Sequence, residues 1–288
     1  MSVDSGTLYI VATPIGNMDD ISLRARETLS AVNLIAAEDT RRTRRLLTNL
    51  GIKNRLLSCH DHNESARAGQ ILESLGRGED VALVSDAGTP LVSDPGYKLL
   101  REVLAAGFRV TPVPGASAVL AALSAAGLPS DRFYFEGFLP ASKGSRAARL
   151  AVLATFTDTL IVFESVHRIA ATTAELIATF GPSRRACFCR ELTKRHESFY
   201  RGTLLDIQTL LGDDPGAAKG EFVLVLEGYN APAVDASEEE LGRVLDVLLA
   251  SVSVSQAASL AAGITGLPRR KAYQLALARQ GEASENDD

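Results

Sequence analysis

The 288-residue chain is predicted to be an α/β protein of two α/β domains, followed by a small all-helical C-terminal unit. Three observations support this prediction. Short β-branched apolar runs alternate with amphipathic stretches in the first half, which indicates βαβ units and a mainly parallel sheet. After residue 132 the strand-like runs lie closer together, which favours a mixed sheet with antiparallel pairs. Beyond residues 228–237, a linker by composition, no strand pattern remains.

The first half contains signals for several strands and helices. Residues 7–13 (TLYIVAT) have the length and composition of a buried strand. Ser22 is a plausible N-cap for a helix at 22–30, and Gly51 closes a helix at 41–50. The remaining elements expected in this half are strands at 32–37, 80–84 and 109–113 and helices at 65–75 and 97–106.

The second half is expected to combine a mixed sheet with a helical end. The expected strands are 132–137, 159–163, 185–190, 197–202 and 221–227, and the expected helices are 116–126, 145–156 and 167–179. Three short helices, at 238–250, 255–262 and 268–279, resemble a helix-turn-helix appendage. The acidic tail is predicted to be disordered. The domain boundaries that follow are 1–115, 116–229, 237–280 and a tail at 281–288.

Composition places the chain among cytoplasmic proteins. It is 46% hydrophobic and 23% charged, and no apolar run approaches the length of a membrane span. The first residues lack the basic region of a signal peptide. Three cysteines are too few for a disulfide framework, and Cys187 and Cys189 should share one buried face of a strand. The net charge of −5 means that a nucleic-acid partner would need local basic patches.

Three loops rich in small or turn-forming residues each follow a predicted strand: residues 13–17 (TPIGN), 85–96 (SDAGTPLVSDPG) and 114–118 (PGASA). The carboxyl ends of parallel strands lie at one edge of a sheet, where ligands bind. Glycines there allow the backbone to approach a ligand closely. The alternative for the first and third loops is a structural turn or close helix–sheet packing. We expect the three loops to share one crevice.

The order of the motifs VATPIGN, AEDTRRTRRLL, SCHDHNE, VSDAGTPLVSDPG, PVPGASA, FEGFLP, FESVHR and KGEFVLVLEG resembles that of the tetrapyrrole methylase superfamily, over residues 6–280. Within it, the motifs are most similar to those of enzymes that methylate the ribose 2′-hydroxyl of cytidine 1402 in 16S ribosomal RNA. The resemblance implies S-adenosylmethionine in a cleft between the two α/β domains, a homodimer, and the 30S subunit or its RNA as partner.

The resemblance also implies which residues contact the cofactor: Ile15, Gly16, Ala87, Gly88, Thr89, Val92, Ser117, Ala118, Glu164 and Phe222. Porphyrin-pathway members carry a Gly-Pro-Gly turn and a Gly-Asp-Pro loop, where this chain has Pro-Ile-Gly and Gly-Thr-Pro. This difference disfavours a tetrapyrrole substrate. The alternatives are a porphyrin-pathway C-methyltransferase and a non-catalytic ribosome-assembly factor that binds RNA.

Two basic clusters are candidate RNA-binding surfaces. The first is Arg41, Arg42, Arg44 and Arg45, near the start of a predicted helix, where the helix dipole disfavours cations. A phosphate partner would explain arginines at such a place. The alternative is a solvated face paired with nearby carboxylates. The second cluster is Lys143, Arg146 and Arg149.

Methyl transfer to a hydroxyl requires removal of its proton, so a nearby base would help. The candidates are Asp86, Glu164 and His60, with Asp39 as a further possibility, and the sequence does not rank them. The polar segment at residues 60–64 (HDHNE) contains potential metal ligands, but their clustering is weak evidence for a metal site. A methyl donor that is already activated needs no metal, and we expect none.

Overall fold

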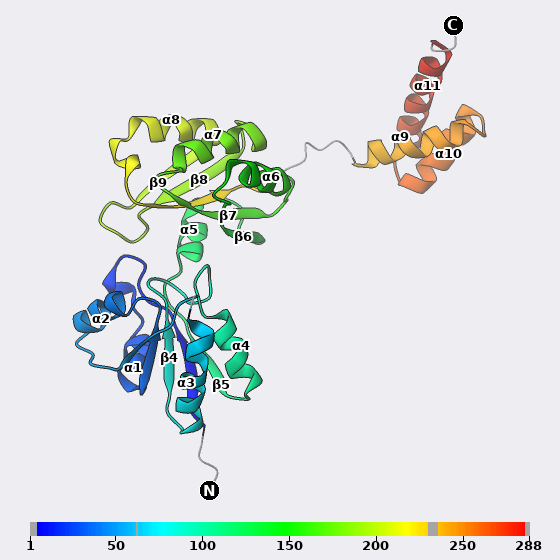
Figure 1. Cartoon of the computed structure of the whole chain (residues 1–288). Helices are drawn as coiled ribbons and strands as arrows, with labels where there is room; N and C mark the ends of the chain where they lie inside the picture. The colour runs from blue at the N-terminus through cyan, green and yellow to red at the C-terminus, as the bar shows by residue number, and fades with distance from the viewer. Residues whose placement is uncertain (1–4, 62, 230–235, 286–288) are drawn as a thin grey trace. The chain divides into compact units, whose positions relative to one another are not determined.

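The computed structural model describes residues 5–61, 63–229 and 236–285. The chain divides into two compact units, Met1–Tyr229 and Asn230–Asp288 (Figure 1). The first unit contains two five-stranded sheets, one built before residue 115 and the other after residue 130. The observed fold confirms the predicted class of two α/β sheets plus a helical end.

The first sheet is entirely parallel, as predicted, with the strand order β3-β2-β4-β1-β5. Its strands are β1 (Thr7–Val11), β2 (Leu34–Ala37), β3 (Leu56–Ser58), β4 (Val81–Val84) and β5 (Arg109–Val113). Helices α1 (Leu23–Ala31) and α2 (Thr40–Asn49) pack on one face, and α3 (Glu64–Gly76) and α4 (Tyr97–Ala105) pack on the other. A short 3-10 helix, η1 (Met18–Asp20), precedes α1.

Burial on both faces explains the composition of the first sheet. Strands β2 and β4 are buried at every position, so they are continuous apolar runs rather than alternating ones. Leu29 and Leu47 fill one face, while Ile71 and Leu99 fill the other. Ser22 caps α1 as predicted, because its hydroxyl accepts a hydrogen bond from the Ala25 amide.

The second sheet is mixed, with the strand order β6-β7-β10-β8-β9. Its strands are β6 (Phe133–Phe138), β7 (Thr159–Ser165), β8 (Arg185–Arg190), β9 (Ser198–Thr203) and β10 (Glu221–Leu226). Strand β6 runs parallel to β7, and the other pairs are antiparallel. Helix α5 (Ala118–Ala126) covers one face, and α6 (Lys143–Leu153), α7 (Ile169–Phe180) and α8 (Leu204–Asp213) cover the other.

Side-chain alternation decides which residues of the second sheet face α5. Ile161 and Val223 pack with α5, together with Cys187 and Cys189, whereas Phe222 belongs to the core on the opposite face. The two thiols lie 3.7 Å apart and are buried, as their spacing predicted. All three cysteines are free.

Helix α8 and the last helical turns differ from the sequence prediction. No helix was expected at α8, although Thr203 and Asp206 form a capping box whose spacing is visible in the sequence. A 3-10 helix, η2 (Pro215–Ala218), follows it. Residues 281–285 belong to a helix rather than to a disordered tail, because alanine and glutamate there have high helix propensity. Residues 286–288 lie outside the described residues.

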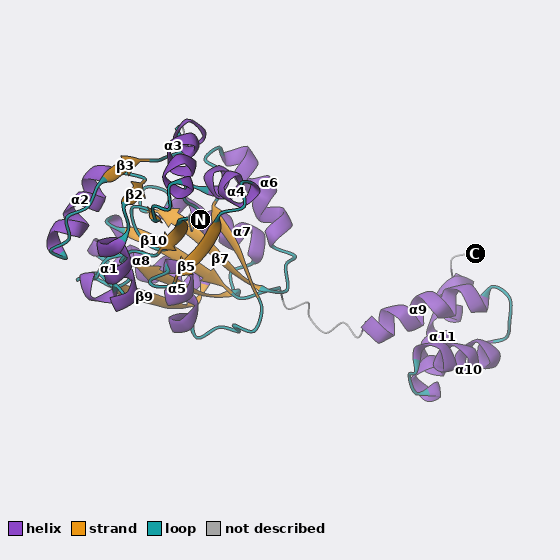
Figure 2. Ribbon diagram, turned by 90° about the horizontal axis from the view of Figure 1, so that it is seen from below, coloured by secondary structure: helices purple, strands orange, loops and turns teal. Residues whose placement is uncertain are grey.

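The C-terminal unit consists of three helices, α9 (Ala236–Leu249), α10 (Val254–Thr265) and α11 (Arg269–Glu285), drawn without strands in Figure 2. Leu241 and Leu245 pack against small residues of the other two helices, among them Ala257 and Ala276. Helix α10 begins at Val254 after the N-cap Ser253, one residue before the expected start at 255. Among the described residues, none of the helices has both the length and the apolar character needed to span a membrane.

Candidate functional site

The three loops predicted to share a crevice are joined by hydrogen bonds. The backbone amides and carbonyls of Thr13 and Gly88 form a reciprocal pair, at 2.9 and 3.0 Å. The Thr89 hydroxyl donates to the carbonyl of Ala116 at 3.2 Å. Gly88 has φ +81°, a conformation that favours glycine, and an added Cβ would lie 3.3 Å from Cγ2 of Ile15. The turn after β1, the loop after β4 and the turn after β5 therefore form one continuous wall.

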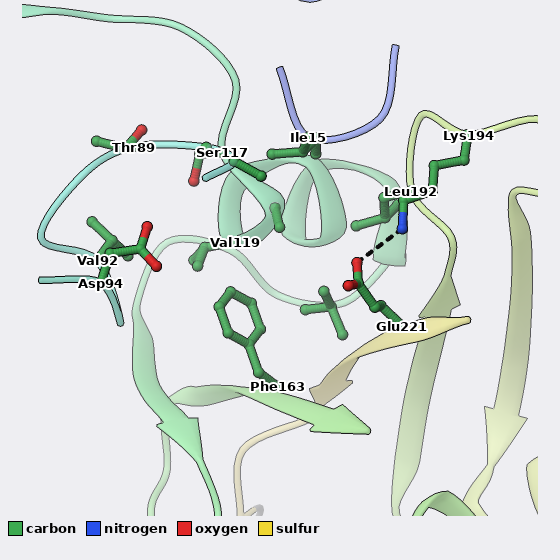
Figure 3. A pocket seen from close by; sticks show the side chains of 14 residues that line it. Ile15, Thr89, Val92, Asp94, Ser117, Val119, Phe163, Leu192, Lys194 and Glu221 are labelled. Atoms are coloured by element: carbon green, nitrogen blue, oxygen red, sulfur yellow. Dashed lines mark hydrogen bonds and ion pairs between the residues drawn. The ribbon is translucent and has the colours of Figure 1, made fainter. Parts of the chain in front are cut away.

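A pocket of about 660 Å³, part of it open to solvent, lies between this wall and the second sheet (Figure 3). The cavity itself is about 140 Å³, below the roughly 300–1,000 Å³ of sites that enclose a drug-sized ligand, so a ligand of that size would extend into the open part of the pocket. The lining residues are Ile15, Ala87, Gly88, Thr89, Val92, Asp94, Ser117, Ala118, Val119, Phe163, Leu192, Lys194, Glu221 and Val223. The site thus draws on both α/β sheets of the first unit.

The pocket has an apolar interior and polar ends. Figure 3 shows the Phe163 ring projecting from β7 into the space, with Asp94 to one side of it. At the other end Lys194 Nζ lies 2.8 Å from the Glu221 carboxylate. The hydroxyls of Thr89 and Ser117 line the loop wall. An apolar cavity with a few polar groups at its edges suits a ligand with both a flat apolar ring and charged groups.

Seven of the ten residues that the resemblance implied for the cofactor line this pocket: Ile15, Ala87, Gly88, Thr89, Val92, Ser117 and Ala118. Gly16 follows the pocket-lining residue Ile15 in the chain, and a Cβ added at Gly16 would be 2.4 Å from Cγ of Lys194. Gly16 therefore allows the first turn to approach the segment that carries Lys194.

Glu164 and Phe222 do not line the pocket. Each is next to a strand residue that does, Phe163 in β7 and Val223 in β10, and neighbouring side chains on a strand point to opposite faces. Phe222 is 2% exposed in the core beneath α7 and α8. The two side chains therefore point away from the pocket, and a contact of these residues with the cofactor stays a prediction.

Glu164 is also a poor candidate base, because its carboxylate is fully engaged. It accepts hydrogen bonds from the Arg168 guanidinium at 2.8 Å and the Thr172 hydroxyl at 2.7 Å, and its side chain is 0% exposed. These contacts hold β7 to the start of α7. Glu164 is a structural residue on the face of the sheet opposite the pocket.

Asp86 and His60 lie outside the pocket lining as well. The Asp86 carboxylate accepts from the Asp39 amide at 3.1 Å and pairs with Arg42 at 3.2 Å. His60 shapes the turn before α3, where its amide donates to the Asn63 side chain at 2.8 Å. His62, in the same polar segment, lies outside the described residues.

Asp94 is a titratable group in the pocket that sequence reasoning did not select. Burial raises its pKa to about 6, and the carboxylates of Glu38, Asp86 and Asp61 act in the same direction against a hydrogen bond from Ser85. The loop at 85–96 was predicted to be functional, yet only Asp86 was chosen from its two aspartates. The pocket position and raised pKa of Asp94 make it the better candidate for proton transfer.

The arginines of α2 fall into two pairs. Arg41 contacts the N-cap residue Asp39 at 2.8 Å, and Arg42 contacts Asp86. Arg44 and Arg45 are exposed, and their guanidinium groups have no ion pair within the described residues. Together with Arg41 they line a shallow surface depression. Arg44 and Arg45 are thus the part of this cluster that is free to meet an anion.

Two of the three residues of the second basic cluster form ion pairs within the protein, and its RNA-binding role stays a prediction. Arg146 is 7% exposed and pairs with Glu175 at 2.6 Å. Arg149 pairs with Glu136, also at 2.6 Å. Lys143, at the start of α6, is exposed. In the part of the chain that is described, no cluster of histidine, cysteine and carboxylate residues is arranged to hold a metal ion.

Comparisons with known families and structures agree with this geometry. The family profile for Tetrapyrrole (Corrin/Porphyrin) Methylases matches residues 7–208, and the profile for the RsmI C-terminal HTH domain matches residues 235–280. A 22% identical structure, that of the methyltransferase CobJ, covers 78% of this chain and 95% of its own length with a TM-score of 0.58. A uroporphyrin-III C-methyltransferase from Thermus thermophilus complexed with S-adenosyl homocysteine is 19% identical, covers 77% of this chain and 97% of its own length, and has a TM-score of 0.52.

Curated relatives align along nearly the whole chain. A protein of Pseudomonas aeruginosa named Ribosomal RNA small subunit methyltransferase I is 48% identical over 98% of this chain and 100% of its own length. Proteins of the same name from Xylella fastidiosa and Escherichia coli O157:H7 are 52% and 49% identical. They cover 93% and 96% of this chain, and 98% and 96% of their own lengths.

The raised pKa of Asp94 predicts a pH-dependent stability difference. Because the folded chain holds this proton up to about pH 6 and the ordinary value is 3.8, the free energy of unfolding should fall as pH rises between these values. Asp94→Asn cannot ionise, so its melting temperature relative to wild type should be higher at pH 7.5 than at pH 4. Melting curves at both pH values measure this, with the exposed Asp131→Asn as control. An equal difference at both pH values would contradict the prediction.

Proposed function

We propose that this chain, which belongs to the tetrapyrrole (corrin/porphyrin) methylase family, methylates the ribose 2′-hydroxyl of cytidine 1402 in 16S ribosomal RNA, with S-adenosylmethionine as methyl donor. The observation that carries the proposal is the pocket in which three strand-end loops meet the second sheet, with Asp94 at its edge. The names of the nearly full-length relatives support the choice of ribosomal RNA as substrate.

The pocket residues fit S-adenosylmethionine. Val119, Phe163 and Val223 offer an apolar surface for an adenine ring, and glycine at position 88 lets the backbone approach a ligand. The Lys194–Glu221 pair at one end can meet the charged groups of the methionine part, which leaves Asp94 at the other end for the substrate. When bound, the cofactor supplies a methyl group that is already activated on a sulfonium.

The residues of the chain then have two tasks, alignment and proton removal. The joined loops fix the donor against one wall, which favours alignment of the ribose oxygen with the methyl carbon. Asp94 accepts the proton of the ribose hydroxyl through a carboxylate oxygen. A pKa of about 6 keeps it ionised at neutral pH while leaving it more basic than an exposed aspartate.

The proposal extends to partners and location. Arg44 and Arg45 contact RNA phosphates, Lys143 adds a further cation, and the helical unit at 237–280 assists RNA binding. The enzyme acts as a homodimer in the cytoplasm. Light scattering of the purified chain tests the dimer, because a molar mass of 30.6 kDa would contradict it.

The experiment that tests the function is mass mapping of 16S RNA. Unmethylated 30S particles and free 16S RNA are incubated with the chain and S-adenosylmethionine carrying an isotopically labelled methyl group. We expect the label on the ribose of cytidine 1402. A label on another nucleotide would contradict the assigned target. In a parallel incubation with a tetrapyrrole, labelling of the tetrapyrrole but not of RNA would favour C-methylation, and failure to bind the cofactor would favour a non-catalytic assembly factor.

The base role of Asp94 has its own test. Wild-type kcat/KM should rise with pH through about 6, as the carboxylate loses its proton. Asp94→Asn should lower kcat by roughly 10²–10⁴-fold and abolish that acid limb, because a positioned base contributes about this much. Asp86→Asn, from the same loop, is the matched control and should retain the limb. An acid limb that persists in Asp94→Asn would assign the base elsewhere.

The pocket assignment is tested with two glycine substitutions of equal backbone strain. Gly88 and Gly107 both have φ +81°, but an added Cβ meets Ile15 at Gly88 and nothing within 4 Å at Gly107. Gly88→Val should abolish detectable binding of S-adenosylmethionine in calorimetry, while Gly107→Val lowers stability and leaves the affinity unchanged. Wild-type cofactor affinity in a folded Gly88→Val variant would refute the pocket.

The RNA-binding role of α2 is tested by salt dependence. Replacing Arg44 and Arg45 together with alanine should weaken binding to 30S particles and reduce the log–log salt slope by roughly 0.7–0.9 for each phosphate that is no longer neutralised. The charge-matched control is Arg67→Ala with Arg101→Ala, on helices α3 and α4 of the opposite face. Cofactor affinity should be unchanged in both variants. An equal effect of the two pairs would show that only net charge matters.

A further inference from the structure

Phe138, at the end of β6, is an exposed aromatic residue beside the pocket. Its side chain is 59% exposed, and its ring centroid lies 5.5 Å from that of Phe163 in an edge-to-face arrangement. Phe163 itself lines the pocket, as Figure 3 shows. A large apolar ring exposed at the edge of a ligand site is a candidate binding surface.

A β-bulge turns Phe138 toward the pocket face. Phe135 pairs with Ile161 and Phe138 pairs with Phe163, so three steps along β6 match two along β7. Without the extra residue, Phe135 and Phe138 would face opposite sides of the sheet, because side chains alternate. With it, both rings contact Phe163. Bulges that redirect a side chain are common next to active sites.

The bulge also brings β6 against the loop that carries Asp94. Gly137 has φ +77°, and an added Cβ would lie 3.0 Å from the Ser93 hydroxyl oxygen. On either side of Ser93 in that loop, Val92 and Asp94 line the pocket. Phe138 therefore lies beside the apolar interior, and the residue before it meets the loop that carries the proposed base.

Two arginines fix the backbone that follows Phe138. Arg168 donates to the carbonyl of Leu139 at 3.2 Å, and Arg146 donates to those of Pro140 and Ala141 at 3.3 and 3.0 Å. The carboxylates of Glu164 and Glu175 hold these two guanidinium groups in place. The exposed ring thus stands on a rigid support, which lowers the entropic cost of binding against it.

We propose that Phe138 is the platform on which the base of the methylated nucleotide stacks while its ribose hydroxyl faces the pocket. This inference rests on the proposed function. RNA-binding proteins hold unpaired bases by stacking them on exposed aromatic rings. The bulge, the pocket-lining Phe163 and the arginine-braced segment together place such a ring at the entrance, so Phe138 is a substrate-positioning and specificity residue.

The test uses an RNA fragment of the target region with a fluorescent cytidine analogue at the methylated position. Wild type should quench its fluorescence on binding, whereas Phe138→Ala should not quench it. The alanine variant should also raise KM for the RNA by roughly 5- to 150-fold, the equivalent of one stacked base, with cofactor affinity unchanged. Phe138→Trp should restore quenching, and Phe138→Leu, which keeps apolar volume, should not.

The matched control is Phe133→Ala, which removes a 42% exposed ring from the other end of the same strand and should retain wild-type quenching. Wild-type quenching and KM in Phe138→Ala or Phe138→Leu would overturn the proposal. A changed oligomeric mass in these variants with quenching retained would assign the ring to a subunit contact instead. If wild type methylates neither the unlabelled fragment nor 30S particles, the proposed function itself fails.

Discussion

The candidate site depends on the two backbone hydrogen bonds between Thr13 and Gly88. They can form because Gly88 has φ +81°, which places its amide and carbonyl against the turn after β1. Once this turn is fixed, Thr89 reaches the carbonyl of Ala116 and joins the third loop. Further along, Leu91 and Ser93 have φ values of 76° and 61°, a strained conformation that persists only where surrounding contacts determine it. The two hydrogen bonds between Thr13 and Gly88, together with this strained backbone, set the position of Asp94.

Alternate residues of a strand face opposite sides of the sheet, and this alternation decides which side chains form the pocket wall opposite the loops. It also marks a limit of prediction from sequence. Alternating strand and helix patterns were enough to predict a parallel sheet followed by a mixed one. The resemblance carried Glu164 and Phe222 into the site, but one residue along a strand reverses the direction of a side chain. Phe163 and Val223 occupy the pocket because β7 and β10 present those positions to α5. Both strands can be predicted from the sequence, but the face of the sheet on which each side chain lies depends on tertiary pairing.

The same limit applies to charged residues, whose partners lie far along the chain. Arg146 is neutralised by Glu175, 29 positions away, so its place in a basic segment did not reveal its structural role. The basicity of Asp94 has a similar origin, because burial in the folded chain raises its pKa and the carboxylates of Glu38 and Asp61, which act in the same direction, come from segments that follow two other strands. Composition and spacing identified the loop that carries Asp94. Only the folded arrangement distinguishes this aspartate from Asp86 in the same loop.

The distribution of charge around the pocket also explains how an acidic chain can accept a polyanion. Burial and the carboxylates gathered near Asp94 keep it basic, but these carboxylates would repel RNA phosphates. The arginines of helix α2 both offset the negative charge near Asp94 and leave cations open for phosphates. Its first two arginines, Arg41 and Arg42, contact Asp39 and Asp86 and offset part of the negative charge, while Arg44 and Arg45 remain open on the next turn. Under the proposed function, this arrangement would attract RNA phosphates to Arg44 and Arg45 at the side of the site rather than to its centre. The ribose could then approach the basic carboxylate of Asp94 while the RNA phosphates stay away from that carboxylate.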